Sequence, residues 1–172
     1  MQFPRLISAA VVLFWLAVPL AGQTLVPLPA RTGPILLTVT GLDATLHPGG
    51  KLELDRGMLQ AIGTATITTT SIWTEGRHTY TGVALKALAA ELGAGDANLR
   101  FHALNDYAVE FAAGDSSDTA PILAYEVDGV PMSVRDKGPV WVLYPFDASA
   151  EYRTDMIYER SIWQLDRIDV LR

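Results

Sequence analysis

The chain has 172 residues, a formal net charge of −6 at pH 7 and no cysteine. An acidic chain without a basic run is a poor candidate for binding nucleic acid or an anionic membrane surface. The lack of cysteine excludes disulfide bonds, and it leaves no thiolate for metal binding or nucleophilic catalysis.

Residues 1–22 have the layout of a secretory signal peptide, with one cation at Arg5, an apolar stretch over 6–20 and small residues at the end. We therefore expect cleavage near residue 22 and a periplasmic location. An uncleaved membrane anchor is the alternative, but the apolar stretch of about 15 residues is shorter than the roughly 20 that span a bilayer. Residues 23–34 read as a linker rich in Pro, Gly and Thr, and residues 35–172 as one domain.

The first half of this domain alternates between short strands and one short helix. Strands are predicted over residues 35–40, 51–54 and 65–72, and the last of these is dominated by β-branched Thr and Ile. Asp55 is placed to cap a helix over 56–62 that Gly63 ends.

A polar segment over residues 73–82 follows, with two aromatic residues and two glycines, and we predict a loop there. Residues 83–92 carry a single apolar stripe at helical spacing, closed by Gly93. Strands are predicted over 98–103 and 107–111 on either side of a turn at 104–106, and a polar loop over 114–119.

A hairpin and a buried strand dominate the rest of the chain. Residues 122–127 form a predicted strand, and Asp128-Gly129 is a hairpin-turn dipeptide. The unbroken apolar run over 140–144 predicts a strand buried on both faces. A short helix over 151–159 and a last strand over 161–170 complete an α+β domain on a mixed or antiparallel sheet with short helices.

No familiar catalytic signature is present: the sequence has no GxSxG, GxxxxGK[ST], HExxH or GxGxxG motif. His47, His78 and His102 are scattered and adjoin no second ligand at metal spacing. The residues by themselves therefore indicate an exported α+β domain with an aromatic and charged cluster, and no metal site.

Four stretches, in their order and spacing, resemble small exported proteins related to the molybdopterin-binding domain of sulfite oxidases. They are GRHTYTGVALKALAAELG, the triplet Asn105-Asp106-Tyr107, ILAYEVDGVPMSVRDKGPVWVLYP and RSIWQLDRIDV. The resemblance implies a mixed sheet with a pterin held in a cleft between loops. It also implies that short Cys-free members report the pterin to the sensory domain of a membrane signalling protein, such as a cyclic di-GMP enzyme or a kinase.

The chain departs from the oxidase pattern at the groups that hold metal and phosphate. The cysteine that ligates molybdenum is missing, and residues 69–73 stand in its neighbourhood. Of the basic residues that anchor the cofactor's phosphate, only Lys137 has a counterpart; Trp141 and Ile162 stand near the other two positions. We therefore expect no molybdenum, and a ligand that is neutral, flat and stackable, such as a free reduced pterin.

Flat ligand faces favour aromatic partners, and the pyrimidinone edge of a pterin needs hydrogen-bonding partners. The ligand-binding candidates are Trp73, Tyr107, Trp141 and Tyr144 for stacking, and Arg77, Asn105, Asp106, Asp136 and Lys137 for the polar edge. Core packing is the competing interpretation for Trp141, and it is the role assigned to Trp163, because both lie in apolar predicted strands. An Asx-type turn is the alternative for Asn105 and Asp106.

Non-catalytic binding of a reduced pterin is the function expected from these features. A molybdopterin-dependent oxidoreductase of the sulfite oxidase type and a ligand-free exported structural module are the alternatives.

Overall fold

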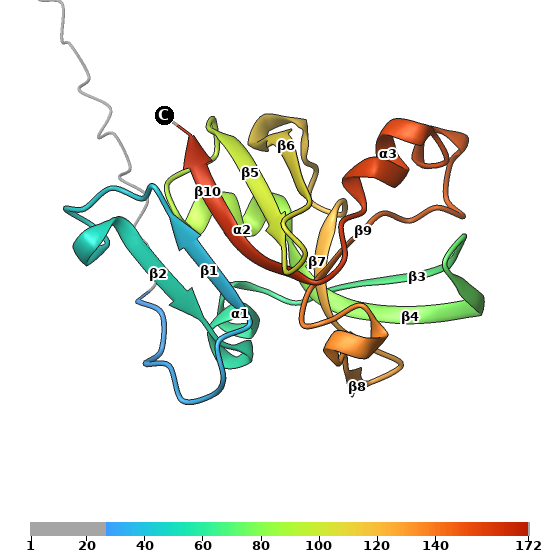
Figure 1. Ribbon diagram of the computed structural model, residues 1–172, viewed down its shortest axis with the longest axis horizontal. Helices are drawn as coiled ribbons and strands as arrows, with labels where there is room; N and C mark the ends of the chain where they lie inside the picture. The colour runs from blue at the N-terminus through green and yellow to red at the C-terminus, as the bar shows by residue number, and fades with distance from the viewer. Residues whose placement is uncertain (1–26, 172) are drawn as a thin grey trace, which may run out of the picture.

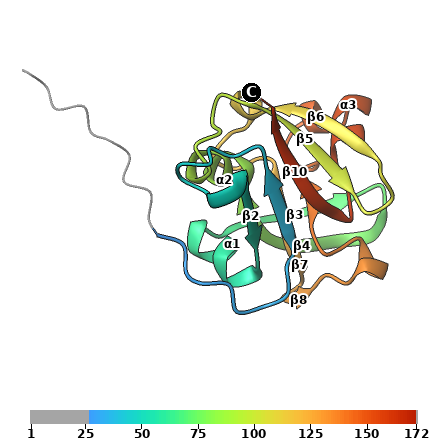
Figure 2. The same cartoon turned by 60° about the vertical axis from the view of Figure 1, so that its left-hand side comes forward.

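The computed structural model describes residues 27–171, so the predicted signal peptide over 1–22 lies outside the described residues. Two five-stranded sheets and a few short helices make up the fold (Figures 1 and 2). This arrangement confirms the α+β class, but it divides the strands between two sheets where the sequence analysis predicted one.

The first sheet has the order β2-β1-β10-β5-β6 and is mixed, since β1 and β10 run parallel and the other neighbours antiparallel. Its strands are β1 (Leu37–Thr40), β2 (Lys51–Leu54), β5 (Asn98–Ala103), β6 (Ala108–Ala112) and β10 (Leu165–Leu171). Strand β10 thus lies between β1 and the β5–β6 hairpin. This pairing joins the two ends of the domain.

The second sheet is antiparallel, with the order β3-β4-β7-β8 and with β9 paired to β7. Its strands are β3 (Ala65–Ser71), β4 (Thr74–Ala84), β7 (Ile122–Val127), β8 (Val130–Pro131) and β9 (Trp141–Leu143). Asp128 and Gly129 join β7 to β8 with φ angles of 50° and 78°, so the predicted hairpin turn is confirmed.

Within residues 27–171, three α-helices and four 3-10 turns connect the strands. The helices are α1 (Arg56–Ile62), α2 (Leu85–Glu91) and α3 (Asp155–Arg160), and the 3-10 turns are η1 (Pro48–Gly50), η2 (Ala113–Asp115), η3 (Val134–Asp136) and η4 (Ala150–Tyr152). Helices α1 and α2 contact each other and β4, whereas α3 lies beside β6 at the other end of the molecule (Figure 1).

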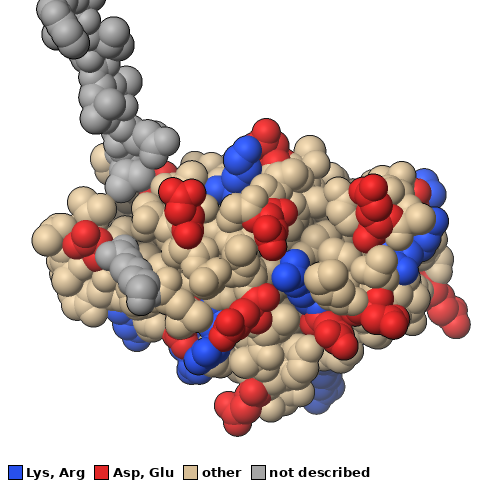
Figure 3. All heavy atoms as spheres, turned by 90° about the horizontal axis from the view of Figure 1, so that it is seen from above, with Lys and Arg blue, Asp and Glu red and all other residues tan. Residues whose placement is uncertain are grey.

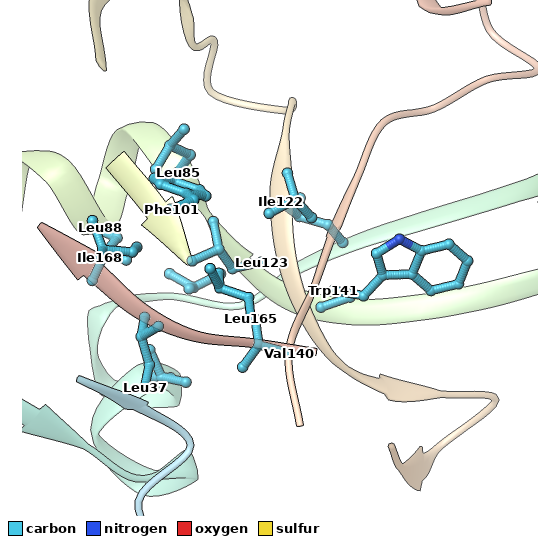
Figure 4. Packing of buried hydrophobic residues seen from close by; sticks show 14 of the residues in the cluster. Leu37, Leu85, Leu88, Phe101, Ile122, Leu123, Val140, Trp141, Leu165 and Ile168 are labelled. Atoms are coloured by element: carbon cyan, nitrogen blue, oxygen red, sulfur yellow. The ribbon is translucent and has the colours of Figure 1, made fainter. Parts of the chain in front are cut away.

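The core consists mainly of aliphatic side chains, with Phe101 and Phe111 stacked among them, and a second aromatic group lies beside it. Figure 4 shows Trp141 directed away from Leu37, Leu165 and Ile168, toward the β3–β4 hairpin. All three residues of β9 are buried, as the apolar run predicted. Strand β9 therefore lies between this core and the aromatic group, which consists of Trp73, Trp141, Phe146, Tyr158 and Trp163.

The segment over 73–82 differs from its prediction as a loop. Strand β4 occupies Thr74–Ala84, and β3 and β4 form a long hairpin whose turn consists of Ile72 and Trp73. The predicted helix over 83–92 starts two residues late, because Val83 and Ala84 pair with β7.

Asp55 joins the start of the described chain to α1. Its carboxylate caps the helix by accepting from the Met58 amide at 2.9 Å, as predicted, and it accepts from the Thr32 and Gly33 amides at 2.7 Å each. These backbone donors lower the pKa of Asp55 below its usual value. The predicted linker over 23–34 is therefore fastened to the domain at its end.

Replacing Asp55 with Asn should lower the melting temperature by several degrees at pH 7, because an amide cannot accept three backbone hydrogen bonds through one oxygen. A lowered folded-state pKa stabilises the fold above about pH 4 and stops doing so as pH falls through the folded-state value. The difference in melting temperature between wild type and Asp55→Asn should therefore shrink below about pH 4. Asp96→Asn, at an exposed position, is the control; parallel melting profiles of the two variants would contradict the assignment.

Candidate functional site

Two pockets lie on either side of a pair of tryptophans, Trp73 and Trp163. The larger one, which we call the aromatic cleft, has a volume of about 380 Å³ and is lined by Trp73, Ala103, Asn105, Tyr107, Tyr158, Glu159, Ser161, Ile162 and Trp163. The second, which we call the basic pocket, measures about 290 Å³ and is lined by Trp73, Arg135, Lys137, Trp163 and Gln164. Since both pockets contain the two tryptophans, they form one continuous candidate site.

Trp73 is the centre of the aromatic group. It occupies the β3–β4 turn, where its amide donates to the Ser71 hydroxyl at 3.2 Å. Its ring meets four other aromatic rings edge to face, with centroids 5.6 to 6.0 Å away, those of Trp141, Phe146, Tyr158 and Trp163. Most of the Trp73 surface is therefore occupied by protein.

Trp141 positions the segment that carries Trp163. The indole is 1% exposed, and its Nε1 donates to the Ser161 carbonyl at 3.0 Å. Backbone bonds on either side, from Val142 to Ile162 and from Leu165 to Val140, hold the segment along β9. Trp163 follows directly and is 37% exposed, so it is the more exposed of the two tryptophans that line the site.

The β5–β6 turn and the end of α3 form the polar wall of the aromatic cleft. Asn105 accepts through Oδ1 from the Tyr107 amide at 3.2 Å, which is the Asx-type turn anticipated for this residue. The Tyr107 hydroxyl donates to the Glu159 carbonyl at 3.2 Å and so joins the turn to α3. An amide, a backbone carbonyl and a phenol therefore line a cleft that is otherwise aromatic.

The structure brings together four of the predicted ligand-binding residues. Trp73, Asn105 and Tyr107 line the aromatic cleft, and Lys137 lines the basic pocket beside Trp73. Trp141 lies beneath the site as part of the core, where core packing had been the alternative.

The other four lie outside both pockets. Arg77 forms a 3.0 Å ion pair with Asp147, and Asp136 accepts from the Ser133 hydroxyl at 2.6 Å. Asp106 is exposed in the turn with a φ of 65°. Tyr144 is buried near Tyr152 and lines a separate pocket of about 150 Å³, and burial raises its pKa to about 12.

The site also contains residues that the sequence analysis left out of its candidates. Trp163 had been assigned to the core, but it precedes β10 and is partly exposed. Tyr158 and Glu159 lie in α3, where a short helix was predicted over 151–159 but no motif indicated a ligand-binding role, and Arg135 and Gln164 complete the basic pocket. Gln164, the polar residue after Trp163, was the one sign in the sequence that β10 starts later than the predicted residue 161.

The lining of this site offers two kinds of contact to a flat molecule. Trp163 offers a ring for stacking, and the cleft wall offers hydrogen-bonding groups at its margin. Within residues 27–171, no group of three or more His, Asp or Glu side chains is arranged to hold a metal ion.

Comparison with known proteins adds no relative, since no family model matches the chain and no curated protein matches it. Across the described part of the chain, none of the helices is both long and apolar enough to cross a membrane.

Proposed function

We propose that this protein binds a reduced pterin, or a closely similar flat heterocycle, in the aromatic cleft without transforming it. The observation that carries the proposal is a partly exposed Trp163 in a cleft of about 380 Å³ with polar groups along one wall. Binding sites for small molecules typically measure roughly 300 to 1,000 Å³ and combine apolar walls with a few polar groups.

The ligand would stack on one ring rather than lie between two. Trp73 and Trp163 have centroids 5.6 Å apart at an interplanar angle of 70°, so each already contacts the other. A ligand between two rings needs parallel planes about 7 Å apart, because each stacking contact takes about 3.5 Å. Trp163 is therefore the proposed stacking surface, and Trp73 supports it.

The polar wall fits the edge of a pterin. That edge presents adjacent donors and an acceptor, which require oxygen acceptors and an N–H or O–H donor close together. The Asn105 side-chain amide supplies both kinds of group, and the Glu159 carbonyl supplies a second acceptor. The fit rests on these residues, and we assign no protonation or redox step to them.

The wider setting of the proposal comes from the resemblance to sulfite-oxidase-like domains. On that basis the protein is a periplasmic pterin-binding protein of this fold, without molybdenum, that reports its ligand to the sensory domain of a membrane signalling protein. A ligand that binds one conformation of the cleft more tightly raises the population of that conformation. A partner protein that binds the same conformation then binds more tightly as well.

Replacing Trp163 with Ala should weaken binding of dihydrobiopterin about tenfold, which corresponds to about 1.4 kcal/mol, because one stacking surface is lost. Trp163→Phe should retain most of the affinity, since it keeps an aromatic face. Titration calorimetry on the purified protein measures both.

Leu46→Ala is the matched control, because Leu46 is 57% exposed and lines neither pocket. The control should bind like wild type. Failure of wild type to bind any pterin, or equal affinities for wild type and Trp163→Ala, would overturn the proposal.

A further inference from the structure

The basic pocket contains two of the three cations that have no acidic partner among residues 27–171. Among residues 27–171, every other Lys or Arg has a carboxylate within 4.0 Å, except Arg153, which donates to the Phe146 carbonyl at 2.8 Å. Arg135 makes no ion pair, and the Lys137 ammonium lies 5.6 Å from the centre of the Trp141 ring.

This concentration of unpaired positive charge stands out in an acidic protein. The chain carries 19 acidic and 13 basic residues, and Figure 3 shows acidic and basic side chains interspersed on the face in view. Carboxylates are therefore plentiful, yet none pairs with Arg135 or Lys137. Two neighbouring cations that border one pocket create a local positive potential suited to an anion.

The backbone of the basic pocket is held in an unusual conformation. Lys137 and Gln164 have φ angles of 71° and 53°, a region that residues other than Gly, Asn and Asp seldom occupy. The Gln164 amide donates to the Lys137 carbonyl at 2.9 Å, and its side chain donates to the Val134 carbonyl at 2.8 Å. Such conformations persist where the surroundings enforce them, and they gather at binding sites.

Gly138 allows the same loop to pack tightly. Its amide donates to the Ser133 carbonyl at 2.7 Å, and a Cβ at this position would lie 2.6 Å from the Met132 carbonyl carbon. The loop that carries both cations is therefore fastened to itself and to the residue after Trp163. The backbone from which both cations extend is therefore fixed beside the stacking surface.

We propose that the ligand of this site carries an anionic group, a carboxylate or a phosphate, which Arg135 and Lys137 receive while its ring stacks on Trp163. This inference rests on the proposed function and changes the ligand class, because the sequence analysis expected a neutral ligand. Arg135 can form two parallel hydrogen bonds to either oxyanion, and Lys137 adds a point charge. Carboxylates and phosphates share this chemistry, so the test needs probes that distinguish one from the other.

The test compares matched probes by titration calorimetry on the full-length exported protein. Pterin is paired with carboxypterin, and neopterin with neopterin monophosphate. We expect at least one anionic probe to bind about tenfold tighter than its neutral counterpart at low salt, with an advantage that shrinks as salt screens the charges. A preference for carboxypterin identifies a carboxylate, and a preference for neopterin monophosphate identifies a phosphate.

The double variant Arg135→Gln, Lys137→Gln should abolish that advantage, so that the charged and the neutral probe of each pair bind within about twofold of each other. The control Lys86→Gln, Arg100→Gln removes the same charge from two exposed, ion-paired positions outside both pockets, and it should keep the advantage. Equal affinities for charged and neutral probes, with neutral pterin still bound through Trp163, would overturn this inference alone. If no probe binds, both this inference and the proposed function fail.

Discussion

Replacing Gly82 with Ala should lower the stability of the domain by more than about 3 kcal/mol, or roughly 10 °C in melting temperature. Gly82 is buried in β4 at a register shift against β7. A Cβ there would lie 2.6 Å from the carbonyl carbon of Leu123 and 2.7 Å from the Cα of Ala124. Because both contacts are with backbone, relief requires the two central strands to separate.

Gly95→Ala is the matched control for this substitution. Gly95 is exposed, and a Cβ there would meet no atom within 4 Å. Its effect should stay within about 0.5 kcal/mol. Thermal unfolding followed by circular dichroism measures both variants, and similar melting temperatures for the two would show that β4 and β7 are not packed as described.

Replacing Trp73 with Ala should cost about 2 to 4 kcal/mol of stability, because the substitution removes the ring that contacts four others. The surrounding rings come from β9, α3 and the segment before β10, which are joined to one another partly through Trp73. Their collapse into the vacated space would close the cleft, so ligand affinity should fall together with stability.

Trp73→Phe tests how much of the effect depends on the size of the indole, since it keeps an aromatic ring in contact with its neighbours. It should recover more than half of the stability. Urea unfolding followed by fluorescence measures both variants, and an unfolding midpoint unchanged by Trp73→Ala would contradict the central packing role of this residue.

Local signals predicted many of the elements correctly. Asp55 as a helix cap, the Asp128-Gly129 turn and the strand over 98–103 all depend on residues close together in sequence, and the structure confirms each one. The β3–β4 hairpin escaped prediction because the first half of β4 is polar on both faces. Its pairing comes from distant partners, such as the Thr68 and Thr79 hydroxyls 3.0 Å apart across the hairpin.

The division into two sheets was likewise beyond sequence patterns, because alternation shows which residues form strands and not which strands pair. The candidate site was predictable only in outline. Trp73 was singled out as part of a polar loop, whereas it lies in a two-residue turn whose polar neighbours belong to a strand. Trp163 was missed because its exposure depends on where β10 begins, and Ile162 before it and Leu165 two residues after it continue the apolar pattern across that boundary.

The two tryptophans that support the cleft differ in how freely they could change during evolution. Trp141 fills the core with one face of its indole and fixes the Ser161 carbonyl with its nitrogen, so any replacement selected for a new ligand must first survive folding. Trp163, Asn105 and Arg135 are exposed at the margin, so replacing them costs the fold less than replacing a buried residue. A library randomised at those three positions should therefore yield folded proteins with altered ligand preference, because recognition and folding are assigned to different residues.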